Sequence, residues 1–298
     1  MFQREEINYQ LDHISLSALA HGDKEQPLVL CLHGYLDNAA SFIPLMKSNS
    51  LRNRRIIALE WPGHGHSQHR NNGAHYHFLD YVSDLVALFA HNNWPAIDIV
   101  AHSMGAMVAS AFAAAFPEKV KSLTLIDSIG FITAPAQEAT KQLREGILSR
   151  QKTADNKRCF TEATAIKARL NVSDLTEHHA KMLVARALIE LPLKEQLADD
   201  EPLYHWRSDP RLRTISPYRF TEEHAQQLLS DINCPVQLVY GDKGMSLVVE
   251  GLSTLSSFIP QLKVIKLAGG HHVHMEQAEK LSKILESFYC ENKIKTSV

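Results

Sequence analysis

Ser103 stands where its hydroxyl could act as a nucleophile. The apolar run IDIVAH, residues 97–102, indicates a strand, and the small-residue run AMVASAFAAAF after Gly105 indicates a helix. A serine between the two is held in a sharp turn with its hydroxyl exposed, and the helix start directs N–H groups at developing negative charge. The segment AHSMG matches the G-x-S-x-G elbow except for Ala101 in the first position. The simpler interpretation is that Ser103 only caps the helix.

Three further segments, taken together with this elbow, resemble the α/β-hydrolase superfamily. LHGY, residues 32–35, leaves a strand-sized run as the family's HGx oxyanion loop does. WPGHGHS, residues 61–67, resembles the family's D-x-P-G-x-G-x-S turn, with Glu60 where aspartate is commoner. GHHVHMEQ, residues 270–277, matches the GHxxHxE segment. The resemblance therefore covers nearly the whole chain.

This resemblance implies a role for each segment. The first histidine of GHxxHxE is the catalytic base in the family, and this is His271, which lies after the last strand-like run and before an amphipathic C-terminal helix. The backbone amides of Tyr35 and Met104 are expected to form the oxyanion hole. His33 is expected to be a structural residue of its loop. Trp61 is expected to line the acyl pocket, with a packing role as the alternative.

The acid that orients the histidine is not at its usual place. After the run PVQLVYG the family has Gly-x-x-Asp, whereas this chain has Gly241-Asp242-Lys243-Gly244. Asp127, at the end of VKSLTLID, lies where some superfamily members, notably among haloalkane dehalogenases, have an alternative acid one strand earlier. We therefore expect Asp127 to hold His271, with Asp242 as the alternative and a turn cap as the structural role of Asp127. Either acid preserves the family's chain order Ser, Asp, His.

Within the superfamily, HGYLDNAASF, LEWPGHGHS, AHSMGA and LIDSIG most resemble the serine hydrolase-like proteins. The resemblance implies a Ser-His-Asp hydrolase without metal or cofactor, and we interpret the chain as a carboxylesterase that cleaves a small ester or related acyl substrate through an acyl-enzyme. A triad does not choose its electrophile, so a C–C bond hydrolase, a thioesterase and a perhydrolase remain open. The missing acid at Gly244 also keeps open a catalytically silent binding protein on a hydrolase scaffold.

A metal-dependent hydrolase is the other alternative to weigh. His64, His66 and His69 have the histidine spacing of the HxHxDH zinc motif. Gln68 replaces the aspartate that a binuclear site requires, and the family turn already explains this segment. We therefore expect no metal site.

The elements that must position these residues alternate along the chain. Helical stripes, as at 79–89 and 281–288, separate strand-sized apolar runs, which lie at 27–33, 55–60, 97–102, 120–127, 235–241 and 262–268. Strands that are apolar on both faces fit a parallel sheet covered by helices, so the predicted fold is an α/β-hydrolase fold with a mostly parallel, doubly wound sheet. The alternating pattern of residues 7–18 predicts an antiparallel pair at the sheet edge.

The alternation stops after residue 130. Residues 131–217 contain helical patterns, such as TEATAIKARL and LTEHHAKMLVARALIELP, and no convincing strand. From Thr221, a good N-cap, a helix followed by a strand-like run resumes the alternation. We predict an all-helical cap at 131–217, inserted in a core of 1–130 and 218–298 and placed over the carboxyl ends of the strands.

The composition is that of a globular chain with a small-molecule partner. A chain of 298 residues can bury about three quarters of its surface without disulfides. The 31 Lys and Arg against 33 Asp and Glu disfavour binding to nucleic acid or an anionic membrane. No stretch has the pattern of a signal peptide or of a membrane span, and no CxxC pair occurs, so we expect a cytoplasmic protein. The sequence does not indicate the oligomeric state.

Overall fold

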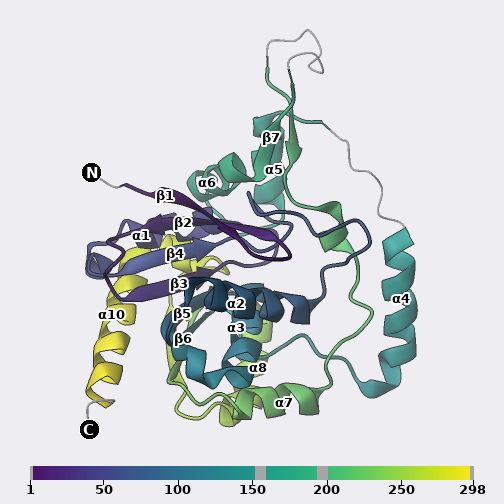
Figure 1. Cartoon of the computed structure of the whole chain (residues 1–298). Helices are drawn as coiled ribbons and strands as arrows, with labels where there is room; N and C mark the ends of the chain where they lie inside the picture. Colours follow the sequence, from purple (N-terminus) through teal and green to yellow (C-terminus); the bar gives the residue numbers. More distant parts are fainter. Residues whose placement is uncertain (1–2, 152–158, 193–200, 296–298) are drawn as a thin grey trace.

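The computed structural model describes residues 3–151, 159–192 and 201–295. Its centre is an eight-stranded sheet in the order β1-β2-β4-β3-β5-β6-β9-β10 (Figure 1). β1 (Glu5–Gln10) and β2 (Ser15–His21) pair antiparallel at one edge, and β2 is also antiparallel to β4. The remaining strands are parallel: β3 (Leu28–Leu32), β4 (Arg55–Leu59), β5 (Ile97–His102), β6 (Val120–Ile126), β9 (Val236–Gly241) and β10 (Lys263–Leu267). The predicted sheet and its antiparallel edge are confirmed.

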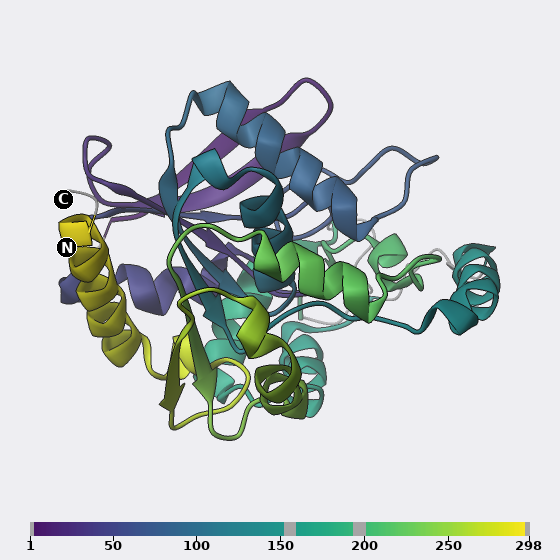
Figure 2. The same ribbon diagram turned by 90° about the horizontal axis from the view of Figure 1, so that it is seen from below.

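Alternate residues of the central strands face two separate hydrophobic cores. Leu30 and Leu32 belong to the core that contains residues of α2 (Phe78–Asn92) and α3 (Met104–Ala115). Val29 and Cys31 belong to the core with α1 (Ile43–Met46) and α10 (Ala278–Lys295). α2 and α10 accordingly lie on opposite sides of the sheet (Figure 2). A strand covered on both faces is apolar at most positions, which is why the apolar runs are nearly continuous. Buried polar residues of these strands bond to one another, as Ser122 does to Asp98 and Gln237 to Thr124.

The remaining core helices connect these layers. α7 (Glu222–Ser230) begins with a capping box at Thr221, as predicted. α8 (Ser246–Leu255) and α9 (Val273–Glu276) follow β9 and β10. Short 3-10 helices fill the connections: η1 (Ala39–Phe42), η2 (Asn49–Leu51), η3 (Pro117–Lys119), η4 (Ala136–Glu138), η6 (Pro210–Arg213) and η7 (Ser256–Phe258).

The segment between β6 and α7 is not purely helical. It contains α4 (Ala139–Gln151), α5 (Glu162–Asn171) and α6 (Glu177–Ala187), but also β7 (Leu188–Glu190) and β8 (Tyr204–Trp206), which pair antiparallel. The expectation of helices alone was wrong here, because each strand is three residues long and shows no apolar run. Residues 152–158 and 193–200 of the predicted cap lie outside the described residues.

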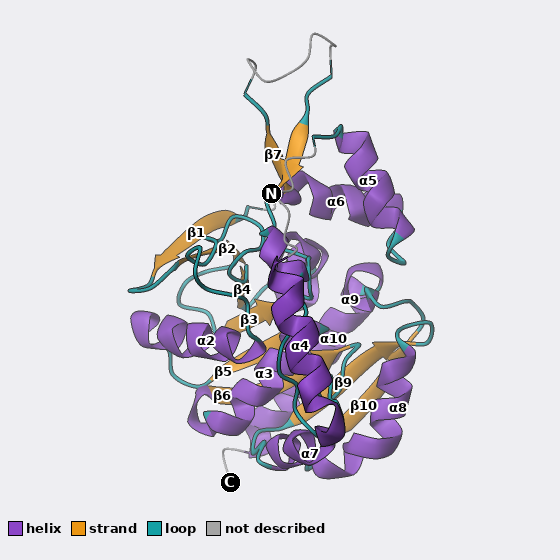
Figure 3. Ribbon diagram, turned by 90° about the vertical axis from the view of Figure 1, so that its right-hand side faces the viewer, coloured by secondary structure: helices purple, strands orange, loops and turns teal. Residues whose placement is uncertain are grey.

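The parts of this segment are placed differently relative to the core. α5, α6 and β7 form a group on one side of the main sheet (Figure 3), joined by a small core that includes Ala165, Val184 and Leu188. α4 lies at the periphery of the molecule in Figures 1 and 2, next to residues 215–217: the N–H of Ile215 donates to Oγ of Ser149 at 2.9 Å. Of the helices in the described ranges, none is both long and apolar enough to span a bilayer.

Candidate active site

Ser103 occupies a strained turn between β5 and α3. Its backbone has φ 51° and ψ −118°, and its N–H donates to the carbonyl of Ile126 on the neighbouring strand at 3.0 Å. Gly105 is required by space, because a Cβ there would lie 2.4 Å from the carbonyl oxygen of Leu32. Such a turn lifts the serine side chain out of the sheet edge, as the elbow motif predicts.

His271 reaches this serine from the loop between β10 and α9. Its Nε2 lies 3.1 Å from Oγ of Ser103, and its Nδ1 lies 2.7 Å from Oδ2 of Asp127. A carboxylate can only accept, so Nδ1 carries the proton and Nε2 accepts from the serine hydroxyl. Ser103, His271 and Asp127 thus form one hydrogen-bonded chain across three strand ends.

Asp127 is buried directly after β6 and is held on both oxygens. Its Oδ1 accepts from the backbone N–H of Gly241 at 3.0 Å, and its Oδ2 accepts from that of Met245 at 3.1 Å. The backbone at Asp127 has φ 45°, which aspartate tolerates better than most residues. Asp242 is exposed, and its carboxylate accepts from the N–H of Gly269 at 2.9 Å. Asp127 is therefore the carboxylate that contacts His271.

The loop after β3 passes close beside Ser103. A Cβ on Gly34 would lie 3.1 Å from Cβ of Ser103, so the backbone at Gly34 passes close to the serine. Tyr35 is the next residue of this loop. Met104 is the first residue of α3, where an amide has no partner within its own helix. Within the described ranges, no hydrogen bond to another residue is recorded for the amides of Tyr35 and Met104.

A cavity of about 1010 Å³ opens above Ser103 and His271. The core contributes the loop of residues 34–38 and the segment around Gly244, while the segment between β6 and α7 supplies much of the remaining wall. The lining residues from that segment are Ala168, Arg169, Val172, Ser173, Asp174, Leu183, Val184, Ala187, Trp206, Ser208 and Arg213. The cavity is thus bounded by both parts of the chain.

Trp61 lies in the hydrophobic core instead of the cavity wall. Its side chain is fully buried, and its Nε1 donates to the carbonyl of His33 at 2.9 Å. The lining of the cavity, taken over the described residues, does not include it. This location matches the packing alternative. His33 is buried beneath it, and burial lowers the pKa of its imidazole to about 4.

The WPGHGHS turn is held by Glu60. Its carboxylate accepts from the N–H of His66 at 2.7 Å and from Nε of Arg186 on α6 at 2.6 Å. The histidines of the candidate zinc motif contact different groups: the ring of His64 is bonded to the carbonyl of Pro62, and that of His69 to the carbonyl of Arg207. Over the ranges that the structure describes, no group of three or more His, Cys, Asp or Glu side chains could hold a metal ion.

Sequence reasoning missed an ionic cluster beside His271. His272 lies between Asp174 at 2.7 Å and Asp37 at 3.4 Å, and Arg169 pairs with Asp37. Arg169 and Asp174 belong to the α5–α6 region, far from the motifs in sequence, so no local pattern could have identified them. Asp37 follows LHGY by only two residues and His272 lies within GHHVHMEQ, so these two members were near the motifs that the sequence showed.

The charges in this cluster shift one another's pKa values. Burial would raise the pKa of Asp37, but the charges of Arg169 and His272 outweigh it and hold this pKa well below its usual range. Burial would lower the pKa of His272, but Asp37 and Asp174 outweigh it and raise this pKa to about 9. His272 is therefore an imidazolium at neutral pH.

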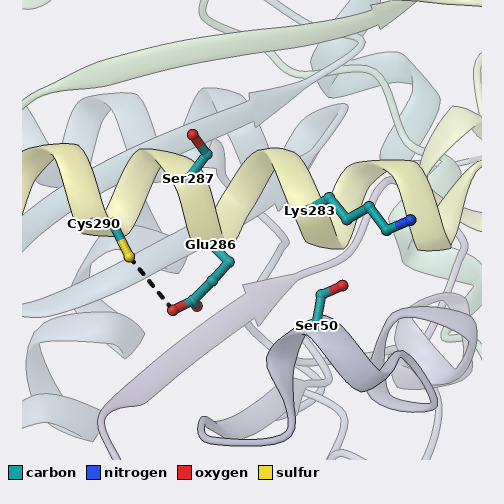
Figure 4. Close-up of a pocket in the computed structure, with 5 residues that line it drawn as sticks. All are labelled: Ser50, Lys283, Glu286, Ser287 and Cys290. Carbon is teal, nitrogen blue, oxygen red and sulfur yellow. Dashed lines mark hydrogen bonds between the residues drawn. The ribbon is translucent and has the colours of Figure 1, made fainter.

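A second depression lies between η2 and α10. It has a volume of about 400 Å³ and is lined by Ser50, Lys283, Glu286, Ser287 and Cys290 (Figure 4). Cys290 donates weakly to Glu286 at 3.7 Å.

The chain is similar to known proteins over most of its length. Residues 27–278 match the family described as alpha/beta hydrolase fold. A serine hydrolase-like protein from Dictyostelium discoideum is 30% identical over 94% of this chain and 80% of its own length. A serine hydrolase-like protein from Danio rerio is 29% identical over 87% and 80%, respectively.

Solved structures agree with these matches. A hypothetical protein from Pseudomonas aeruginosa PAO1 superposes with a TM-score of 0.86 and 33% identity, over 96% of this chain and 99% of that one. The thioesterase domain from the curacin biosynthetic pathway superposes with a TM-score of 0.81 and 25% identity, over 96% and 99%.

Proposed function

Because this chain belongs to the alpha/beta hydrolase fold family, we propose that it is a serine hydrolase, and specifically a carboxylesterase for a small ester or related acyl substrate. The observation that carries the proposal is the hydrogen-bonded chain Ser103–His271–Asp127 at the floor of the cavity. This order supports the proposal, because acyl transfer by a serine uses a nucleophile, a base and an orienting acid linked in the same order.

The chemistry follows from the protonation of His271. Nε2 takes the proton of Ser103 as Oγ attacks the carbonyl carbon, and Asp127 stabilises the resulting imidazolium through Nδ1–H. The amides of Tyr35 and Met104 receive the oxyanion of the tetrahedral intermediate. His271 then protonates the leaving group. Water, deprotonated by the same Nε2, attacks the acyl carbon. The bond from that carbon to Oγ of Ser103 breaks, Nε2 returns the proton to Oγ, and the acid is released. No step requires a metal or organic cofactor.

The substrate has to fit under the segment 131–217, which we interpret as a cap. Its cavity-facing residues include apolar side chains, among them Val172, Leu183, Val184 and Ala187. Such a wall suits the acyl chain of a neutral ester and excludes water during the reaction. A thioester is the second candidate, supported by the similarity to the curacin-pathway thioesterase domain, because both substrates begin with attack of a serine on a carbonyl.

A fluorophosphonate probe and a panel of substrates test the proposal. The probe should label Ser103 in the wild type, and p-nitrophenyl esters of increasing length should be hydrolysed faster than CoA thioesters of the same acyl groups. Ser103→Ala should lower turnover by roughly 10⁴ to 10⁶ while leaving the fold intact. Faster thioester cleavage would select the second candidate. Absence of both labelling and turnover would identify a silent binding protein.

A further inference from the structure

Asp174, in the turn between α5 and α6, touches the loop of His271 twice. Its Oδ1 accepts from Nδ1 of His272 at 2.7 Å, and its Oδ2 accepts from the backbone N–H of His271. The approach depends on Gly270, because a Cβ at that position would lie 1.7 Å from Oδ2 of Asp174. A residue of the proposed cap thus bonds directly to the main chain of the proposed base.

The other side of the His271 main chain is held by the core. Nε2 of His102, at the end of β5, lies 2.9 Å from the carbonyl oxygen of His271. A carbonyl only accepts, so this nitrogen of His102 carries the proton. The N–H of His271 is therefore held by the cap and its C=O by the strand that carries Ser103. Its ring can meet Ser103 and Asp127 together only while the main chain stays in this place.

A second ion pair, between Arg169 and Asp37, joins the same region of the cap to the core. Arg169 of α5 donates to Asp37, whose other oxygen faces His272. The side chains of Asp37 and His272 are only 1% and 5% exposed, so these contacts are largely shielded from water. Arg169, Asp37, His272 and Asp174 thus form a continuous ionic bridge from α5, through the core, back to the start of α6.

We propose that Asp174 is a positioning residue, through which the seating of the cap sets the geometry of His271. The inference rests on the proposed function, because it assigns His271 the role of base. Asp174 accepts hydrogen bonds from His271 and His272 and takes no part in proton transfer. Removing it would free the N–H of His271 and one nitrogen of His272. A displacement of the base by about 1 Å is enough to cost on the order of 100-fold in rate.

Asp174→Ala and Asp174→Asn test this role, with Glu177→Gln as the matched control. Glu177 is an acidic residue three positions further on, exposed and paired with Lys181 at 2.6 Å. Two measurements do not depend on how a long acyl chain fits the cavity. They are the rate at which a small fluorophosphonate labels Ser103, and kcat with p-nitrophenyl acetate.

Asp174→Ala should lower both rates by roughly 10- to 100-fold with KM for the acetate changed less than threefold. Asp174→Asn should recover part of the loss, because its amide oxygen can still accept from the His271 N–H. Glu177→Gln should stay within twofold of the wild type. If Asp174→Ala fails to fold, Asp174→Asn is compared with the wild type instead, and it should label and turn over more slowly with KM for the acetate changed less than threefold.

Two results would overturn the inference. In the first, Asp174→Ala and Asp174→Asn raise KM for long esters but leave labelling and acetate turnover unchanged, which would make Asp174 a substrate contact. In the second, Glu177→Gln loses as much activity as the Asp174 variants. A wild type that the probe does not label would refute the proposed function instead. The positioning role is then decided by hydrogen exchange: the His271 amide should exchange at least tenfold faster in Asp174→Ala, and an unchanged rate would refute it.

Discussion

Gly244 and Asp127 share one site: a Cβ atom on residue 244 would lie 2.2 Å from Oδ1 of Asp127. The carboxylate that contacts His271 fills the space in which a side chain at 244 would begin. Glycine at the family's usual acid position therefore leaves room for this carboxylate, which supports our proposal that Asp127, from the neighbouring strand, is the acid.

Asp127→Asn should lower turnover by roughly 10³ to 10⁴, because an amide neither selects the Nδ1–H tautomer of His271 nor stabilises its cation. Asp242→Asn should stay close to the wild type, since its carboxylate bonds to Gly269 at the surface. Steady-state kinetics on one p-nitrophenyl ester measures both. The reverse ranking would make Asp242 the acid.

Gly244→Ala should lower turnover by on the order of 100-fold, because its Cβ displaces the carboxylate of Asp127 and with it the imidazole. Gly73→Ala is the matched control, since a Cβ there meets no atom within 4 Å. Equal activity of Gly244→Ala and the wild type would show that the site can widen without moving His271.

Moving the acid should restore part of the activity. Asp127→Gly relieves the positive φ at 127 and empties the site, and Gly244→Asp added to it supplies a carboxylate from the usual position. The double variant should exceed Asp127→Gly by roughly tenfold or more in kcat. A double variant no faster than Asp127→Gly would mean that a carboxylate from 244 cannot reach Nδ1 of His271.

Ala187→Phe should shorten the preferred acyl chain, because residue 187 ends α6 at the cavity wall and a phenyl ring there would fill part of the pocket. The ratio of kcat/KM for octanoate to that for acetate esters should fall roughly tenfold or more. Ala187→Ser, which adds little volume, should keep the wild-type ratio. Equal losses on all esters would indicate damage to the fold or to the hydrogen-bonded chain.

Stability should fall on the alkaline side through His272. Its pKa is raised to about 9 in the folded chain by Asp37 and Asp174 against the opposing effect of burial. A raised pKa stabilises the fold fully below the unfolded value near 6.5, and this contribution is lost as the pH rises through about 9. The loss should reach up to about 3 kcal/mol.

Urea unfolding at pH 6 and at pH 9.5 measures this effect. The wild type should lose more unfolding free energy between the two pH values than His272→Gln does. His178→Gln, on the exposed side of α6, should behave as the wild type. Parallel pH profiles for the wild type and His272→Gln would show that His272 does not titrate with the fold in this range.

The sequence alone determined the strands of the main sheet and three residues of the candidate site. Continuous apolar runs indicated the parallel strands because both faces of such a sheet are covered. Ser103 and Asp127 were identifiable because each follows directly on a strand, and His271 because the segment GHHVHMEQ after the last strand resembles the family's GHxxHxE segment. All carboxyl ends of parallel strands meet at one edge, so residues at those ends converge wherever they lie in the chain. The strands β7 and β8 were not predicted, because a strand of three residues is too short to show an alternating or continuous apolar pattern.

The tertiary structure alone decided how the insertion meets the core. Asp174 bonds to His271 across 97 positions of the chain, and Arg169 reaches Asp37 across 132. Nothing local requires an aspartate at 174 or an arginine at 169, because exposed turns and helix faces accept either residue. Their roles arise only when folding places them beside a buried carboxylate and a glycine, and the same packing places Trp61 in the core and leaves Asp127, not Asp242, within reach of His271.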